Sequence, residues 1–110
     1  MQIKRQSPPL VDPAVTIPLG HGRSVLISRV DYNWVRRYRW SARRSAHCIY
    51  AVRKFQRDGK TYYRKLHREV LFAPPGMDVH HINGDTLDCR RENLELLSPS
   101  AHRLAHYRVP

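Results

Sequence analysis

Histidines gather in the last third of the sequence, at spacings that suit metal binding and proton transfer. His80 and His81 are adjacent, and His102 and His106 lie four residues apart near the C-terminus. On a helix, a separation of four places two side chains on one face with Cβ atoms about 5–6 Å apart, near enough to share one ion. Together with His80 they form a three-ligand set with an open position for water or phosphate. We therefore predict a one-metal site at His80, His102 and His106.

The doubled histidine is expected to divide into two roles. His80 and His81 lie in an extended run, Met77–Ile82, that leads into the turn sequence Asn83-Gly84-Asp85. Adjacent strand residues point to opposite sides, so the two cannot be equivalent ligands unless the backbone bends. His81 is then available as a general base for an attacking water, and a nearby cation would lower its pKa and keep it neutral. Each histidine taken singly also fits an ordinary surface or capping role.

The elements that position these histidines can be predicted from local patterns. Leu94–Leu97 is a second extended run that can pair back with Met77–Ile82. Ser98 suits a helix N-cap, and Pro99 suits the first helical position, where its missing N–H costs nothing. The predicted order is strand, long loop, strand and helix.

The region upstream is predicted to form a small sheet with one short helix. Two β-branched runs flank a glycine break, then comes an apolar helical stripe, and three further strands follow, the last two joined by Asp58-Gly59. Ser28 and Asp31 stand at capping-box separation before the helix. The predicted elements are a hairpin of 15–19 and 24–28, a helix over 31–38, and strands over 40–44, 48–56 and 61–66.

A short helix over Leu66–Phe72 is predicted to follow this sheet and to end at the prolines Pro74 and Pro75. His67 on this helix is interpreted as a structural histidine, with assistance at the site as the alternative. We divide the chain into a flexible lead-in (1–13), a β-rich basic region (14–66) and a site-bearing region (67–110).

The charge of the chain indicates a polyanionic partner. Lys and Arg number 20 against 9 Asp and Glu, which gives a net charge of +11. Asp58 is the only acidic residue between Arg36 and Arg68. A two- or three-stranded ribbon fits the major groove of DNA, although solubilising charge alone is the plainer explanation. The candidate DNA contacts are Arg43, Arg44, Arg53, Lys54, Arg57, Lys60, Arg64 and Lys65.

Other features exclude several classes of protein. The sequence has no apolar run of the roughly 18–20 residues that span a bilayer and no apolar secretory core, so we expect a cytoplasmic protein without a membrane partner. Cys48 and Cys89 form no Cys-x-x-Cys pair and are expected to be reduced. A chain of 110 residues leaves little room for an enclosed cavity, so no small-molecule substrate is expected. We expect a monomer or a weak homodimer.

The motifs of the last third resemble those of the HNH endonucleases, in their small phage and homing-endonuclease branch. The resemblance rests on His80-His81-Ile82-Asn83-Gly84-Asp85, Leu87-Asp88, Arg90-Arg91-Glu92-Asn93-Leu94-Glu95-Leu96-Leu97 and Ser100-Ala101-His102. Upstream, the sequence is similar to the AP2-like DNA-binding region that often precedes this motif. That second resemblance rests on Ile17-Pro18-Leu19, Asp31-Tyr32-Asn33-Trp34, Tyr38-Arg39-Trp40 and Tyr50-Ala51-Val52-Arg53.

The resemblance implies an α+β fold that ends in a ββα-metal motif. It aligns His81 with the general base, His80 with the first metal ligand and His102 with the final histidine. Asn93 corresponds to the central asparagine, which binds the metal in some relatives and braces the base-bearing loop in others. His106 matches an additional ligand of the bacterial-toxin nucleases. Many phage relatives have Asp at the position of His80, so histidine favours Zn²⁺ or Ni²⁺, whereas Mg²⁺ or Mn²⁺ is expected to support activity.

We therefore predict a metal-dependent endonuclease that hydrolyses phosphodiester bonds of double-stranded DNA and is encoded by a phage or mobile element, acting in the cytoplasm of a bacterial host. Its catalytic residues are predicted to be His81 and Asn93. The main alternative is a DNA-binding regulator in which the metal is structural. A basic RNA- or virion-associated protein explains the charge but not the ordered histidine and asparagine series.

Overall fold

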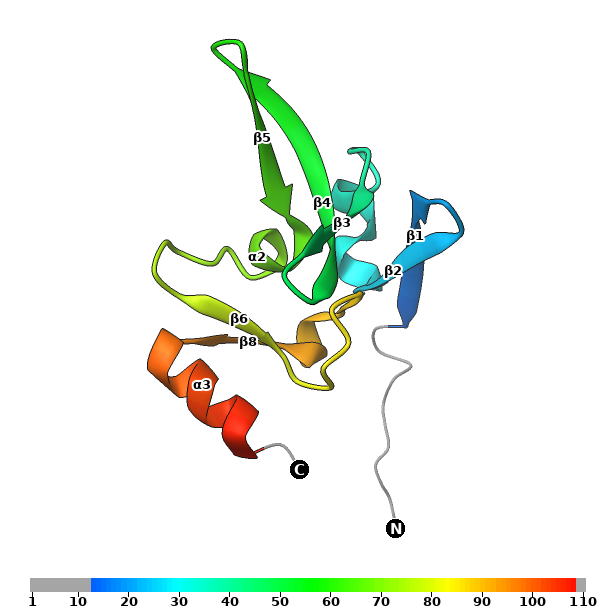
Figure 1. Cartoon of the computed structure of the whole chain (residues 1–110). Helices are drawn as coiled ribbons and strands as arrows, with labels where there is room; N and C mark the ends of the chain where they lie inside the picture. The colour runs from blue at the N-terminus through cyan, green and yellow to red at the C-terminus, as the bar shows by residue number, and fades with distance from the viewer. Residues whose placement is uncertain (1–12, 109–110) are drawn as a thin grey trace.

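The computed structural model describes the backbone of residues 13–108 and the side chains of residues 13–104. Residues 1–12 of the predicted lead-in and the side chain of His106 lie outside the described residues. The fold is α+β, as predicted (Figure 1). Its elements are β1 (Ala14–Gly20), β2 (Arg23–Ser28), η2 (Arg29–Asp31), α1 (Tyr32–Val35), β3 (Ser41–Ser45), β4 (Cys48–Arg57), β5 (Lys60–Lys65), α2 (Leu66–Val70), β6 (Asp78–His81), β7 (Asp88–Cys89), η3 (Arg91–Asn93), β8 (Leu94–Leu97) and α3 (Pro99–Arg108).

The first sheet joins two strands near the N-terminus to a strand from the last third of the chain. Strands β1 and β2 form the predicted antiparallel hairpin. Strand β7 adds to it in parallel, with Leu26 opposite Asp88 and Ile27 opposite Cys89. This two-residue strand was not predicted, because two residues are too few to show an alternating pattern. It attaches the loop after His81 to the N-terminal hairpin.

The second sheet, β3-β4-β5, matches the three predicted strands to within one or two residues. Asp58 and Gly59 link β4 to β5 with φ angles of 53° and 76°. Two positive φ angles are the mark of a type I′ turn, whose twist suits a hairpin. The β4–β5 hairpin projects away from the rest of the molecule, on the side opposite α3 (Figure 1).

The predicted helix over residues 31–38 is shorter than expected, because it consists of the 3₁₀ turn η2 followed by the four residues of α1. The predicted capping box is wrong: neither Ser28 nor Asp31 caps the helix through its side chain. The Ser28 hydroxyl instead accepts a hydrogen bond from the Arg91 N–H at 2.9 Å. The Asp31 carboxylate accepts from Trp34 Nε1 at 2.8 Å and from Arg91. Arg91, a residue distant in sequence, thus donates to both side chains that were expected to cap the helix.

The helix predicted over residues 66–72 ends earlier, at Val70, and a Schellman motif closes it. The N–H of Phe72 donates to the Glu69 carbonyl and the N–H of Ala73 donates to the Arg68 carbonyl. Phe72 occupies the left-handed position of this motif, with φ of 51°, where glycine is usual. Such a conformation costs a residue with a Cβ atom about 1–2 kcal/mol. The ring of Phe72 gains no burial in return, because the residue is 87% exposed.

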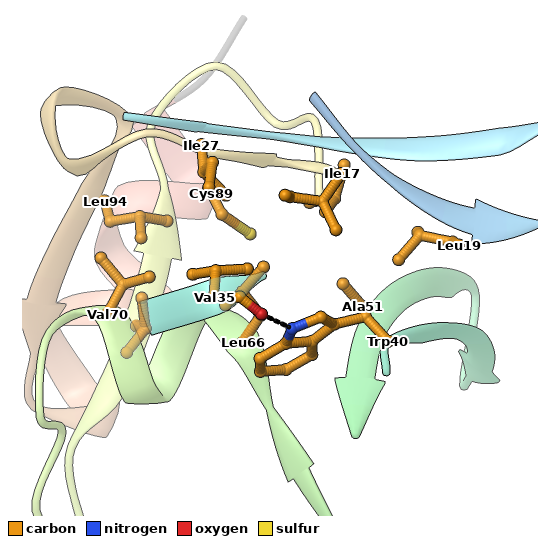
Figure 2. Packing of buried hydrophobic residues seen from close by; sticks show 12 residues of the cluster. Ile17, Leu19, Ile27, Val35, Trp40, Ala51, Leu66, Val70, Cys89 and Leu94 are labelled. Atoms are coloured by element: carbon orange, nitrogen blue, oxygen red, sulfur yellow. Dashed lines mark hydrogen bonds between the residues drawn. The ribbon is translucent and has the colours of Figure 1, made fainter. Parts of the chain in front are cut away.

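One hydrophobic cluster holds the two sheets and the short helices together (Figure 2). Trp40 is buried within it and donates its Nε1–H to the Val35 carbonyl at 2.8 Å. The cluster crosses the predicted boundary between residues 66 and 67. Its members are Ile17, Leu19, Val25, Ile27, Val35, Trp40, Ala51, Leu66, Val70, Val79, Cys89 and Leu94.

Both cysteines are free. Cys89 belongs to the core, and burial raises the pKa of its thiol to about 12. Along residues 13–108, no helix is long and apolar enough to cross a membrane.

Candidate active site

Strand β6 carries the doubled histidine and pairs antiparallel with β8, and α3 begins directly after β8 (Figure 1). This is the predicted strand, loop, strand and helix order. Ser98 accepts a hydrogen bond from the Ala101 N–H at 3.2 Å, which confirms the predicted N-cap before Pro99. His80 and His81 are both buried. Their ring contacts lie with different elements, as the alternation of a strand requires.

The His81 ring faces the second sheet and α2. Its centroid lies 5.0 Å from that of His67 and 6.2 Å from that of Tyr50, and the His67 and Tyr50 rings are 5.2 Å apart. Among the described side chains, His81 Nε2 is a buried polar atom without a hydrogen-bond partner. Buried polar atoms in folded proteins nearly always have a partner, so this nitrogen has capacity for a water or substrate group.

Burial favours the neutral form of the two histidines of this cluster. Removal from water lowers the pKa of His81, and the neighbouring His80 lowers it further. Burial lowers the pKa of His67 to about 3, and His81, Lys65 and Arg68 add to that effect. A neutral imidazole is the form that a general base requires.

The His80 ring faces the start of α3. Its centroid lies 5.2 Å from that of His102, with the two planes at 65°. The Nδ1 atom of His102 lies 3.0 Å from a carboxylate oxygen of Asp78. A carboxylate that holds the second nitrogen of a histidine is a common support for a metal ligand, because it fixes the orientation of the ring.

The donors at this end of α3 fit a divalent ion in their chemistry, with His80 and His102 as imidazole ligands and Asp78 as the support for His102. Across the residues whose side chains are described, no three His, Cys, Asp or Glu groups are arranged as a metal site. His106 lies on α3, but its side chain is outside this part. Two of the three predicted ligands are thus close together.

Asn93 ends the turn η3 and is buried beneath the loop after His81. Its side-chain oxygen accepts a hydrogen bond from the Asn83 N–H at 2.9 Å. Its side-chain nitrogen donates to the Asn83 side-chain oxygen and to the Asp88 carbonyl, both at 2.9 Å. Its backbone carbonyl accepts from the Ile82 N–H at 2.8 Å. This bonding suits a brace for the loop rather than a metal ligand.

Asp88 completes the brace. It accepts two hydrogen bonds from Arg90, at 2.8 and 2.7 Å, and one from the Asn83 side chain at 2.9 Å. These bonds hold the pKa of the Asp88 carboxyl below its usual range, and those from the Arg90 side chain have the largest effect. The loop between β6 and β8 is therefore held by charge-assisted hydrogen bonds.

The basic residues of the second sheet divide between its two faces, as the strand register dictates. On one face, which we call the Tyr50 face, the Arg43 guanidinium lies 4.0 Å from the centroid of Tyr63, and the Lys65 ammonium lies 5.1 Å from that of Tyr50. Because Tyr50 also contacts His81, this face leads to the candidate base. It comprises Arg43, Tyr50, Lys54, Tyr63 and Lys65.

The opposite face, which we call the Arg53 face, holds Arg44, Arg53, Arg57, Lys60 and Arg64. Arg53 donates two hydrogen bonds to the Glu69 carboxylate, at 3.0 and 3.2 Å, and its guanidinium lies over the ring of Tyr38. Arg64 lies 3.7 Å from the same carboxylate. Two of the predicted DNA contacts thus pair with α2.

Three residues at the site were not among the predicted site residues. Asp78 had a signal in the sequence, because it precedes His80 by two positions on a strand and must share its face. Asp88 stood within the motif that resembles the HNH endonucleases but was assigned no role, and nothing in the sequence placed Tyr50 beside His81. Tyr50 reaches His81 only through the packing of β4 against α2, and Asp88 is placed by the unpredicted strand β7.

Residues 73–104 match a family model described as HNH endonuclease. The matched segment contains β6, β7, β8 and the first part of α3. The HNH resemblance is confirmed there, and it indicates a nuclease-type function related to DNA. The similarity of the upstream region to AP2-like domains is not part of this match and stays a prediction. No curated protein and no solved structure matches the chain.

Proposed function

Because residues 73–104 match a family model described as HNH endonuclease, we propose that this protein is a metal-dependent endonuclease that hydrolyses phosphodiester bonds in double-stranded DNA. One observation carries the proposal. Strand β6 presents His80 to His102 on one side and a neutral, buried His81 to the basic second sheet on the other.

His81 acts as the general base. It takes a proton from a water molecule while the oxygen of that water attacks the phosphorus atom. The bond from phosphorus to the 3′ oxygen breaks with its electron pair passing to that oxygen, which takes a proton from solvent, so the products are a 5′-phosphate and a 3′-hydroxyl. The unfilled hydrogen-bonding capacity of His81 Nε2 supports this role. The rings of His67 and Tyr50 restrict its motion.

His80 and His102 hold the metal, with Asp78 fixing the His102 ring and His106 as a further ligand. When bound, a divalent ion neutralises charge on the scissile phosphate and on the leaving oxygen. Asn93 keeps the loop after His81 in place through its bonds to Asn83 and Asp88, so we assign it a bracing role.

The Tyr50 face guides the duplex to His81. Its three cations have no acidic neighbour on the paired strand positions, whereas Arg53 and Arg64 on the opposite face share Glu69. We therefore propose Arg43, Lys54 and Lys65 as backbone contacts for DNA.

Cleavage of supercoiled plasmid tests the catalytic proposal. With Mg²⁺, Mn²⁺, Ni²⁺ or Zn²⁺, the protein should produce nicked or linear DNA with 5′-phosphate ends. The His81→Ala variant should cut at least about 100-fold more slowly. His47→Ala, which alters an exposed histidine in the β3–β4 turn, serves as the control and should cut at the parental rate. Equal rates for parent and His81→Ala would refute the role of His81.

Binding of a duplex in EDTA tests the Tyr50 face. Lys54→Ala should reduce the slope of log K against log salt by about one, because one phosphate contact is lost. Arg36→Ala, at the end of α1, should leave it unchanged. Duplex binding without cleavage under any metal would favour the alternative of a DNA-binding regulator.

A further inference from the structure

A cavity of about 710 Å³ lies beside the helix α2, between α1, β5 and the segment that follows α2. Its lining combines rings with positive charge. The aromatic members are Trp34, Tyr38, Tyr63 and Phe72, and the charged members are Arg53, Arg64, Lys65, Arg68 and Glu69. Four cations against one carboxylate leave the lining net positive, which suits an anionic ligand.

Phe72 is the residue of this cavity whose presence the fold does not explain. It occupies the left-handed position of the Schellman motif, with φ of 51°, and is 87% exposed. Glycine would adopt this conformation without strain, and a polar residue would suit the exposure. A strained residue that buries nothing in the free protein points to a role in binding.

The other three rings of the lining contact side chains of the protein. The Arg53 guanidinium lies 4.0 Å from the centroid of Tyr38, and that of Arg43 lies at the same distance from Tyr63. Trp34 contacts Trp40 edge to face. Of the residues described, none stacks on the ring of Phe72, which is thus open to a ligand.

The cavity and the Tyr50 face share two residues of β5. Tyr63 and Lys65 belong to that face and also line the cavity, because β5 is the edge strand of its sheet. A DNA strand that leaves the duplex on the Tyr50 face can cross this edge and enter the cavity. Positive charge along a groove with aromatic rings is the usual construction of a site for single-stranded nucleic acid.

We propose that this cavity binds an unpaired nucleotide of single-stranded DNA, with its base stacked on Phe72. The cations of the lining lie near its phosphate. The inference rests on the proposed function for its choice of DNA, and it adds a second contact outside the cleavage site. It assigns to the enzyme a preference for duplexes that carry a single-stranded segment, such as an overhang or a bulge.

Fluorescence anisotropy in EDTA, with two probes at equal salt, tests the proposal. One probe is a blunt duplex and the other is the same duplex with a single-stranded overhang. The parental protein should bind the overhang probe more tightly. Phe72→Gly should bind the overhang probe about tenfold more weakly than the parent and the blunt probe equally well. Phe72→Trp, which keeps a ring, should retain the preference.

Thermal unfolding separates this effect from a folding defect. Phe72→Gly should melt at the parental temperature or above it, because glycine relieves the strain. Tyr32→Ala removes an exposed ring that does not line this cavity, and it should keep the preference. The proposal is overturned if the parent shows no preference, if Phe72→Gly keeps it, or if Phe72→Gly weakens both probes equally.

The plasmid assay keeps this proposal distinct from the proposed function. If the parent prefers the overhang probe but cuts no plasmid, and Phe72→Gly loses that preference, the binding site is supported and the proposed nuclease function is refuted. If the parent cuts plasmid but shows no preference for the overhang probe, the nuclease function is supported and the binding site is refuted.

Discussion

The two sides of strand β6 surround their histidines with different groups. On the side of His81, the loop is held by Asn93 and Asp88 through hydrogen bonds of 2.7–2.9 Å, and the base is packed against rings. On the side of His80, the His102 ring lies beside that of His80 and its Nδ1 atom lies 3.0 Å from Asp78, whose side chain is 42% exposed. One side thus packs the candidate base among rings beside a braced loop, whereas the other places the candidate ligands beside a part-exposed carboxylate.

This contrast predicts that changes on the His81 side reduce stability, and that changes on the His80 side reduce metal affinity with little effect on stability. Three experiments test this difference between the two sides.

The largest effect is expected from Asn93→Ala. The change leaves the Asn83 N–H and the Asp88 carbonyl without their partner in a buried loop. We expect unfolding to become easier by about 2–4 kcal/mol, as measured by urea denaturation. Asn33→Ala, at an exposed asparagine of α1, should change stability by less than about 0.5 kcal/mol. Similar values for both variants would show that the loop is not held by Asn93.

The second effect concerns His67 and acid. The folded protein keeps this histidine neutral down to a pKa of about 3, whereas the unfolded chain protonates it near its ordinary value of 6.5. Acid therefore favours the unfolded chain: the stability is fully present above pH 6.5 and is lost as the pH falls towards 3. Each pH unit in the middle of this window costs about 1.4 kcal/mol.

The variant His67→Phe should remove this dependence and unfold with a shallower pH profile. Urea denaturation from pH 7 to pH 4 gives the comparison. The groups that face His67 are His81, Lys65, Arg68 and Tyr50, and all four are unchanged in the variant. Parallel profiles for the two proteins would contradict the neutral state of His67 in the fold.

The smallest effect on stability is expected from Asp78→Asn. The side chain keeps its size but loses the charge that supports His102. Zn²⁺ affinity, measured by calorimetry, should fall by about 10–100-fold, as is usual for the support of a metal-binding histidine. The free energy of unfolding without metal should change by less than about 1 kcal/mol, since the pair is partly exposed to solvent.

Asp58→Asn is the matched control, because it removes the same charge from the β4–β5 turn. It should bind Zn²⁺ as the parent does. A Zn²⁺ affinity for Asp78→Asn equal to that of the control would remove Asp78 from the site, and a large loss of stability would erase the contrast between the two sides.

Local patterns predicted most of the elements of this fold. The Asp58-Gly59 turn, the alternation on β4 and β5 and the Ser98-Pro99 helix start all act over a few residues, so the sequence specifies them directly. The extent of the helices near Asp31 and Phe72 was predicted less well. The first involves Arg91, a distant partner that bonds the Asp31 side chain. The second ends in a Schellman motif at Phe72, where the glycine that usually marks this motif is missing.

The sequence by itself determined that His80 and His81 face opposite sides, because a strand alternates wherever it is placed. It also determined the excess of positive charge and the family motif of the last third. Only the tertiary structure decided which groups meet each histidine. Tyr50 and His67 reach His81 from elements 31 and 14 residues upstream, and Asn93 meets Asn83 across a loop. Such contacts depend on the packing of elements that are distant in sequence, which no local pattern records.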